Sequence, residues 1–245
     1  MPIVENSLIE LLPQKEQRSL LSVADRVSLA LSEVLGKTGT PSSYVYFPID
    51  SFASLVTSID GKPVLEVGMV GSEGMLGVQV VLGVATQPLH ALVQGAGSAW
   101  RVTTRALRQE LVRNRALQLA LDRYVYVLMS QLASSAACIR FHHIEARLAR
   151  WLLMMQDRAH ADSFGITHEF LAYMLGVRRE GITAAAGALD RQGLIEYKRG
   201  WLTVLNRRGL KLVTCTCYAA DNEVYARIMG RTARGRLFER LEQRV

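Results

Sequence analysis

Residues 168–189 read HEFLAYMLGVRREGITAAAGAL, a segment with small and apolar residues at fixed spacings. Ala172 precedes Gly176 by four residues, and Ile182 follows after six more, which is the spacing of a helix-turn-helix. A small side chain at Ala172 lets two helices approach closely, and Gly176 suits a turn position with positive φ. An ordinary helical hairpin is the alternative. The pattern predicts two steeply crossing helices, the second of which can lie in a DNA major groove.

Charged residues begin the second predicted helix. Arg178, Arg179 and Glu180 form its first turn, where they could reach base edges and phosphates. Thr167 precedes the first helix and is a favourable N-cap residue. The segment therefore combines a favourable N-cap for the first helix with a charged first turn in the second helix.

The segment after these helices, GLIEYKRGWLTV at residues 193–204, reads as two short strands around a Lys-Arg-Gly turn. Lys198 and Arg199 lie at this turn, where they would contact a phosphate backbone. Two helices followed by such a β-hairpin, or wing, are more specific than any of these parts alone. Together they indicate a winged helix-turn-helix.

A long apolar stripe precedes this region. Apolar residues recur between Leu117 and Ile139 at spacings of three and four, with no helix breaker between Ala116 and Arg140. A stripe of this length suits a coiled-coil seam, so we expect a homodimer; a helix packed on its own domain is the alternative. The residues expected in the dimer interface are Leu117, Leu121, Tyr124, Leu128, Leu132 and Ile139.

The N-terminal part changes from a helical to a strand pattern. Residues 3–35 read as helical, whereas residues 43–103 contain short β-prone runs between glycines. Asp60-Gly61 is a hairpin signal. These runs predict a small antiparallel roll or barrel. Further helices are expected over 142–156 and 207–229.

The composition is 49% hydrophobic and 21% charged, as in globular proteins. The chain has no apolar run long enough for a membrane span and no basic segment before an apolar one at its start, so we expect no membrane partner and a cytoplasmic location. Residues 1–100 have a net charge of −4, and residues 101–245 have a net charge of +11. This asymmetry favours a scaffold or sensor joined to a polyanion-binding module.

The chain has three cysteines, Cys138, Cys215 and Cys217. An odd and sparse count argues against a secreted disulfide framework. Cys215 and Cys217 are too few ligands for a closed metal site. We therefore expect three reduced structural thiols, no metal and no cofactor.

Taken together, the roll, the long helix and the winged helix-turn-helix resemble the Crp/Fnr superfamily of bacterial transcription regulators over about residues 15–217. The resemblance implies an α+β fold with an N-terminal antiparallel β-roll, a dimerisation helix and a C-terminal DNA-binding domain. The segments that carry it are VGMVGSEGMLG (67–77), IEARLARWLL (144–153), the helix-turn-helix with its wing, and NRRGLKLVTCTCY (206–218). The implied boundaries are 1–110 for a cyclic-nucleotide-binding-like sensor, 111–141 for the dimerisation helix, 142–217 for the winged helix-turn-helix and 218–245 for a basic extension.

The resemblance also implies a DNA-binding surface. Arg179 and Glu180 match an Arg-Glu pair that contacts base pairs and phosphate in relatives, and Thr183 falls where some relatives have a base-reading serine. Many relatives have another Arg at the position of Ala184, so a different half-site is expected. The implied function is a regulator that binds a palindromic operator in double-stranded DNA as a homodimer, with RNA polymerase as a further partner. The residues expected to contact DNA are Thr167, His168, Arg178, Arg179, Glu180, Thr183, Lys198 and Arg199.

An effector pocket is expected in the roll, with an unidentified small effector. Cyclic-nucleotide-binding relatives have a Gly-Glu-Leu turn and a downstream Arg, but residues 86–91 contain no Arg. Burying a phosphate without a cation is costly, so cyclic AMP is expected to bind poorly or not at all. No cysteine precedes Cys138, which excludes the N-terminal iron–sulfur cluster of some relatives. The pocket residues expected are Gly71, Glu73, Gly74, Met75 and His90.

The sequence disfavours two other functions. A cupin-like enzyme needs a cluster of His and carboxylate ligands inside its barrel, yet four of the five histidines lie outside the predicted roll. The chain also lacks Gly-x-Ser-x-Gly, Walker and His-Glu-x-x-His motifs, so no enzyme is expected. A ligand-binding module with a vestigial DNA domain is disfavoured by the intact Arg179-Glu180 pair.

Overall fold

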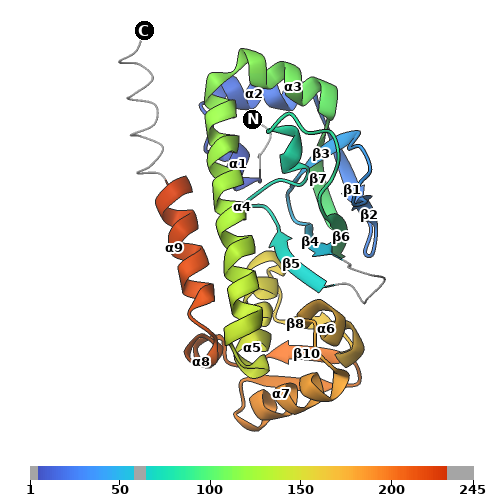
Figure 1. Cartoon of the computed structure of the whole chain (residues 1–245), viewed down its shortest axis with the longest axis vertical. Coiled ribbons are helices and arrows are strands. Elements are labelled where there is room, and N and C mark those ends of the chain that lie inside the picture. The colour runs from blue at the N-terminus through green and yellow to red at the C-terminus, as the bar shows by residue number, and fades with distance from the viewer. Residues whose placement is uncertain (1–4, 58–64, 231–245) are drawn as a thin grey trace.

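The computed structural model describes residues 5–57 and 65–230. A β-roll lies beside one long helix, and a smaller helical unit lies below both (Figure 1). The long helix is α4, Arg115–Phe141, which follows α3, Thr104–Arg113. No described helix has the length and apolar character needed to cross a bilayer.

The N-terminal segment is only partly helical. It contains α1, Ser7–Glu10, and α2, Gln14–Ser22, followed by the strands β1, Ala24–Leu29, and β2, Val34–Gly36. The prediction of helix over residues 3–35 is therefore wrong beyond α2. The reason is long-range pairing, because β1 forms an antiparallel ladder with β7, Gly97–Thr103. Pairing between distant segments outweighs a weak local helical pattern.

The roll consists of two antiparallel sheets, with strand orders β1-β7-β3 and β2-β6-β4-β5. This confirms the prediction of a strand-rich antiparallel unit over residues 43–103. β4 and β5 pair as a hairpin would, although Asp60 and Gly61 lie outside the described residues. A short 3-10 helix, Val78–Val80, lies between β5 and β6 in the sequence, with Gln79 and Val80 buried. The remaining strands are β3, Tyr44–Pro48, β4, Phe52–Thr57, β5, Leu65–Val70, and β6, His90–Gly95.

Helix α4 buries most of its predicted stripe within its own subunit. Leu117, Leu121, Tyr124 and Leu128 are at most 4% exposed and pack in the cores of the roll. These four side chains are therefore not available to a second subunit, contrary to the expectation of a dimer seam. Burying them against the roll removes the same apolar surface from water that a partner would. Leu132 also packs against the roll, which leaves only Ile139 of the expected set exposed.

The segment after residue 206 forms two helices, not the single helix predicted over 207–229. They are α8, Arg207–Val213, and α9, Cys217–Met229. α9 packs along α4 (Figure 1), and Met229 is buried in the same cluster as Leu8 and Leu121. The expected basic extension over 218–245 therefore packs against the core as far as the end of α9. Residues 231–245 of this extension lie outside the described residues.

The lower unit forms a winged helix-turn-helix around one apolar core. The core is formed mainly by helices, with Leu148, Leu152, Leu171, Ile182 and Leu189 completely buried. Burial of each such side chain stabilises the unit by about 2 kcal/mol. A three-stranded sheet, β8-β10-β9, completes it. The elements are α5, Ile144–Ala159, β8, Ser163–Gly165, α6, His168–Leu175, α7, Arg179–Arg191, β9, Ile195–Lys198, and β10, Trp201–Val204.

The roll and the lower unit share an apolar core. Phe52, Val56 and Met69 of the roll belong to the same buried cluster as the helix-turn-helix. The turn between α6 and α7 lies against β5, so that a Cβ on Gly176 would lie 2.7 Å from Leu65 Cδ1. A movement of the roll relative to α6 would therefore expose apolar surface.

Candidate nucleic-acid interface

The two helices of the motif have the local chemistry that the sequence predicts. The Thr167 hydroxyl accepts a hydrogen bond from the Phe170 backbone N–H at 3.1 Å, which caps α6. Gly176 has φ +62° and ends α6 in the left-handed conformation. The Val177 N–H donates to the Ala172 carbonyl at 3.0 Å. These contacts confirm the predicted end of α6 and the turn that leads into α7.

Helix α7 has a charged face that is exposed to solvent. Arg178, Arg179, Glu180, Thr183 and Ala184 are all exposed. No ion pair within the described part of the chain involves either arginine or Glu180. Their charged groups are therefore free to meet a ligand, and the first turn of a helix also offers backbone N–H groups to a phosphate.

His168 connects this face to the wing. Its Nδ1 lies 3.0 Å from the Thr183 hydroxyl, and its ring stacks on Tyr197 with 4.3 Å between centroids. Burial lowers the pKa of His168, and the charge of Arg179 lowers it further. The Thr183 hydroxyl also donates to the Arg179 carbonyl at 3.1 Å. His168 and Thr183 thus border the exposed face but hold each other in place.

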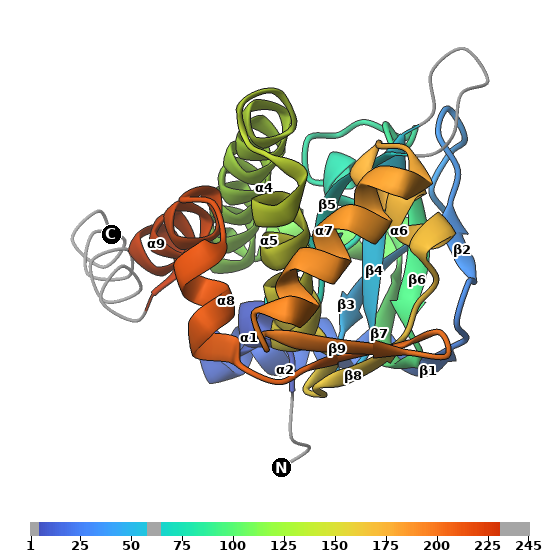
Figure 2. The ribbon, with the colours of Figure 1, turned by 90° about the horizontal axis from the view of Figure 1, so that it is seen from below.

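The wing turns through two residues in the left-handed conformation, Arg199 with φ +52° and Gly200 with φ +82°. Positive φ at both central positions is typical of a type I′ hairpin turn. Lys198 is highly exposed, and its Nζ lies 2.6 Å from Glu196 Oε1. Seen from below, α7 and the β9–β10 hairpin lie on one side of the molecule (Figure 2). The helix that contains the predicted base-reading residues and the hairpin that contains the predicted phosphate-binding residues therefore lie on the same side.

Comparison with protein families agrees with this geometry. Residues 146–213 match the model of the Crp-like helix-turn-helix domain. This part of the chain is therefore similar in sequence to Crp-like helix-turn-helix domains. The match covers α5 to α8 and includes both helices of the motif and the wing. A comparison with curated protein sequences gave no match.

Several solved structures are similar to about four fifths of this chain, and this likeness shows a shared fold. CLP of Xanthomonas campestris, described as a c-di-GMP-responsive global regulator, has a TM-score of 0.65 and 16% identity, covering 78% of this chain and 99% of its own. A crp/fnr-family regulator of Eubacterium rectale has a TM-score of 0.63 and 16% identity, covering 84% and 96%. FixK2 of Bradyrhizobium japonicum has a TM-score of 0.60 and 17% identity, covering 79% and 98%.

Two of the residues predicted for an effector pocket, Gly71 and Glu73, lie where the roll meets α5 and α9. The Glu73 carboxylate accepts hydrogen bonds from the Gly71 N–H at 3.2 Å and pairs with Arg158 Nη2 of α5 at 2.5 Å. The Tyr225 hydroxyl of α9 donates to the Glu73 carbonyl at 2.8 Å. The glycine-glutamate turn therefore connects the roll to α5 and α9.

The other expected pocket residues have different surroundings. A Cβ on Gly74 would lie 2.0 Å from the Tyr124 hydroxyl, so this position has no room for a side chain. Met75 is buried in the core beside α4. His90 is half-buried on β6, opposite Val56 of β4. Sequence reasoning missed Arg158, because nothing local indicates that this residue pairs with a turn 85 positions earlier.

A small cavity of about 30 Å³ lies between the roll, α4 and the Crp-like domain. Its lining includes Glu66 of β5, Arg147 and Arg150 of α5, and Leu175 of α6. Burial raises the pKa of Glu66 to about 7, although the Ser54 hydroxyl, which hydrogen-bonds its carboxylate, acts in the opposite direction. A carboxyl group with a pKa near neutral therefore lies at the contact between the roll and the helix-turn-helix unit.

Replacing Glu66 by glutamine is expected to flatten the pH dependence of stability. Because folding raises the pKa of Glu66, its protonated form is favoured in the fold, and stability present in acid is lost as pH rises through about 7. Between pH 5 and pH 8 the wild type should lose about 1–3 kcal/mol of unfolding free energy relative to Glu66→Gln. Urea unfolding of both proteins at each pH measures this. Parallel curves for the two proteins would contradict it.

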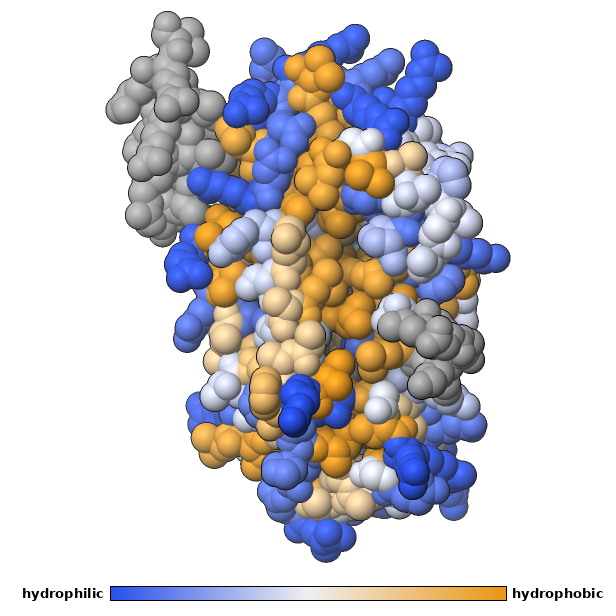
Figure 3. All heavy atoms as spheres, in the orientation of Figure 1, coloured by the Kyte–Doolittle hydropathy of each residue, from blue (hydrophilic) through white to orange (hydrophobic). Residues whose placement is uncertain are grey.

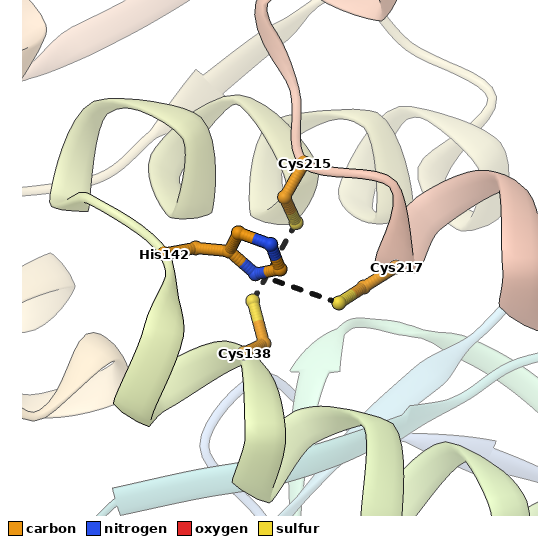
Figure 4. Close-up of side chains that lie close together, drawn as sticks. All are labelled: Cys138, His142, Cys215 and Cys217. Atoms are coloured by element: carbon orange, nitrogen blue, oxygen red, sulfur yellow. Dashed lines mark hydrogen bonds between the residues drawn. The ribbon is translucent and has the colours of Figure 1, made fainter.

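The three cysteines, which the sequence predicts to be reduced structural thiols, are free and lie close together. Cys138, Cys215 and Cys217 are joined by His142, and the ligand atoms of these four residues lie within 4.8 Å of one another (Figure 4). Cys215 and Cys217 alone would be too few ligands, but the fold brings Cys138 of α4 and His142, the residue after α4, beside them. These four residues could hold one metal ion.

Proposed function

We propose that the protein is a Crp/Fnr-type transcription regulator that binds DNA through α7 and the wing. The observation that carries the proposal is that Arg179 and Glu180, at the start of α7, are exposed and form no ion pair with any described residue. They lie in the segment that matches the Crp-like helix-turn-helix model. A helix of this kind enters the major groove with its N-terminal residues on the base edges. The regulator would act in the cytoplasm, together with RNA polymerase.

The residue types on α7 suggest a division of roles. The Arg179 guanidinium can form two hydrogen bonds to guanine, and the Glu180 carboxylate can accept one from cytosine. Arg178, Lys198 and Arg199 would contact phosphates, which position the protein without reading sequence. Ala184 presents only a methyl group to the groove, so the base pairs opposite it would be read weakly. These assignments predict a half-site that differs from those of relatives with Arg at that position.

A palindromic operator requires two copies, and the outer face of α4 is the surface that we propose joins them. Tyr126, Met129, Ala133 and Ala136 are exposed and recur at spacings of three, four and three, as in a coiled-coil seam. A band of apolar residues runs along the line of α4 on this side of the molecule (Figure 3). The two alanines would allow close approach of a second α4. We propose this stripe as the dimer interface in place of the predicted one, which is buried against the roll.

Placing a charge on this stripe is expected to separate the two subunits. In Met129→Arg, a charged group replaces a side chain that is 63% exposed and would be buried against the partner helix. We expect the dimer dissociation constant to rise at least about a hundredfold, equivalent to about 2.7 kcal/mol. Analytical ultracentrifugation measures it, with Val112→Arg on α3 as a matched exposed control. Equal dimerisation of wild type and Met129→Arg would contradict the assignment.

We further propose that cyclic AMP does not control this regulator. The Glu73 carboxylate is already engaged by Arg158 and the Gly71 N–H, so it is not free to bind a ribose hydroxyl. Nor do residues 86–91 provide an arginine for the phosphate. Calorimetric titration with cyclic AMP should give no heat of binding, whereas a micromolar dissociation constant would overturn this part of the proposal.

Selection of binding sites from random duplex DNA tests the proposed function. The purified full-length protein should enrich a two-fold symmetric sequence whose half-sites are centred about 34 Å apart, one turn of DNA. Enrichment without any added small molecule would also show that the apo form is competent. Failure to enrich any sequence, with no binding to DNA even at low salt, would contradict the proposal.

A further inference from the structure

Four potential metal ligands come from two segments that are far apart in the sequence. Cys138 lies in the last turn of α4, and His142 follows four residues later, so the two side chains lie on one side of the helix end. Cys215 and Cys217 lie where α8 connects to α9. In Figure 4 all four side chains point toward a common centre. The three cysteines are buried, and His142 is half-buried.

The spacing of the ligand atoms matches the edges of a tetrahedron around one ion. Zinc bonds of about 2.3 Å to sulfur and 2.0–2.1 Å to nitrogen give edges of about 3.8 Å between two sulfurs and about 3.6 Å between sulfur and nitrogen. Cys138 Sγ lies 3.5 Å from Cys215 Sγ, and Cys217 Sγ lies 3.6 Å from His142 Nδ1. A cluster of several irons would need its ligands further apart, because inorganic sulfides lie between them.

The charges around the cysteines favour an anionic site. Three thiolates and one Zn²⁺ have a net charge of −1. Arg147 and Arg150 are buried, and both interact electrostatically with Cys138 and Cys215. Arg150 pairs with Asp221 at 2.7 Å, but no carboxylate in the described residues pairs with Arg147, which donates to the Leu175 carbonyl. A buried cation is costly without a counter-charge, and a thiolate-rich metal site would supply one.

We propose that Cys138, His142, Cys215 and Cys217 bind one structural zinc ion. Four protein ligands fill a tetrahedral site, so no position stays open for substrate, as in structural zinc sites. The ion would join the end of α4 to the connection between α8 and α9. It would thereby hold together the point where α4 ends and α5, the first helix of the proposed DNA-binding unit, begins. This site does not depend on the proposed DNA-binding function.

The test begins with the metal content of the full-length protein purified under reducing conditions from zinc-supplemented cells. We expect one zinc ion per chain, retained through gel filtration. Cobalt added to the metal-free protein should give the intense near-ultraviolet absorption of thiolate-to-cobalt charge transfer. Because the chain has three cysteines in total, this absorption reports on the proposed ligands alone.

Two neighbouring histidines provide a matched pair of variants. His142→Asn removes one proposed ligand, whereas His143→Asn changes an exposed residue outside the cluster. We expect His142→Asn to weaken zinc binding by about 10-fold or more and His143→Asn to leave it unchanged. Cys217→Ser should lower the cobalt charge-transfer absorption by about a third, since one of three thiolates is lost. Circular dichroism confirms that each variant is folded.

Three outcomes would overturn the proposal. The first is wild-type protein that contains no zinc and takes up no cobalt after full reduction. The second is equal metal binding by His142→Asn and His143→Asn. The third is an intrachain disulfide between Cys138 and Cys215, found by mass spectrometry in freshly purified protein, that on reduction yields thiols without metal affinity. Because the first measurement uses the unmodified chain, failure of a variant to fold leaves the test intact.

Discussion

Replacing Arg179 by alanine is expected to weaken binding to the selected operator by about 1–3 kcal/mol and to relax the preference at one base pair in each half-site. Arg179 lies in the first turn of α7, is exposed and has no ion-pair partner among the described residues. Its guanidinium can therefore face guanine without first breaking a contact. Fluorescence anisotropy with the operator and with single-base variants measures both effects.

Lys198→Ala is the matched comparison on the wing. Its ammonium pairs with Glu196, but the pair is exposed and so contributes little stability. Loss of a phosphate contact should weaken binding to all sequences alike and reduce the slope of log affinity against log salt by about one. If Arg179→Ala and Lys198→Ala reduced sequence preference equally, the division between base-reading and phosphate-binding residues would be wrong.

Replacing Arg158 by alanine is expected to lower the free energy of unfolding by about 2–4 kcal/mol, below the full cost of breaking a buried ion pair because Glu73 is partly exposed. The Arg158 side chain is 10% exposed and that of Glu73 26%, with 2.5 Å between Nη2 and Oε1. Without the guanidinium, the carboxylate would remain beside the buried Tyr124 and lose its counter-charge. Denaturant unfolding followed by circular dichroism measures the loss.

A surface ion pair provides the control for this change. Arg26 and Glu5 lie 3.6 Å apart with side chains 56% and 40% exposed. Arg26→Ala should change stability by less than about 0.5 kcal/mol, since solvent screens such pairs. If Arg158→Ala were as mild as Arg26→Ala, the ion pair would not be an important connection between the roll and α5.

Local chemistry explains why the winged helix-turn-helix could be predicted from the sequence. Thr167 caps α6 and Gly176 takes positive φ, and both depend on backbone geometry within a few residues. The Lys-Arg-Gly turn of the wing is local in the same sense. Signals of this kind do not depend on the remainder of the fold, so the motif and its exposed arginines could be found without the structure.

The predictions that failed concern contacts between distant segments. Strand β1 exists because β7 pairs with it, although β7 begins at Gly97, 73 residues after β1 begins at Ala24. The four potential metal ligands lie together because α9 packs along α4, which brings Cys215 beside Cys138. Neither relation leaves a mark in the local pattern of hydrophobic residues.

Helix α4 shows the limit of periodicity most clearly. It has two stripes with nearly the same spacing, one through Leu121 and Leu128 and one through Met129 and Ala136. Periodicity indicates that each stripe lies on one side of a helix, but it does not say which side the roll will cover. The more hydrophobic stripe is buried within the subunit, and the weaker stripe remains for the proposed partner.

The most direct test of DNA reading by α7 is a parallel selection from random duplex DNA with wild type and Ala184→Arg. Ala184 is exposed on the outer face of α7, so a long cationic side chain there would reach new base edges. We predict that both proteins enrich palindromes with the same half-site spacing, and that Ala184→Arg gains a guanine preference at one symmetric pair of positions. Recovery of the same sequence by both proteins would contradict the central claim that α7 reads the operator.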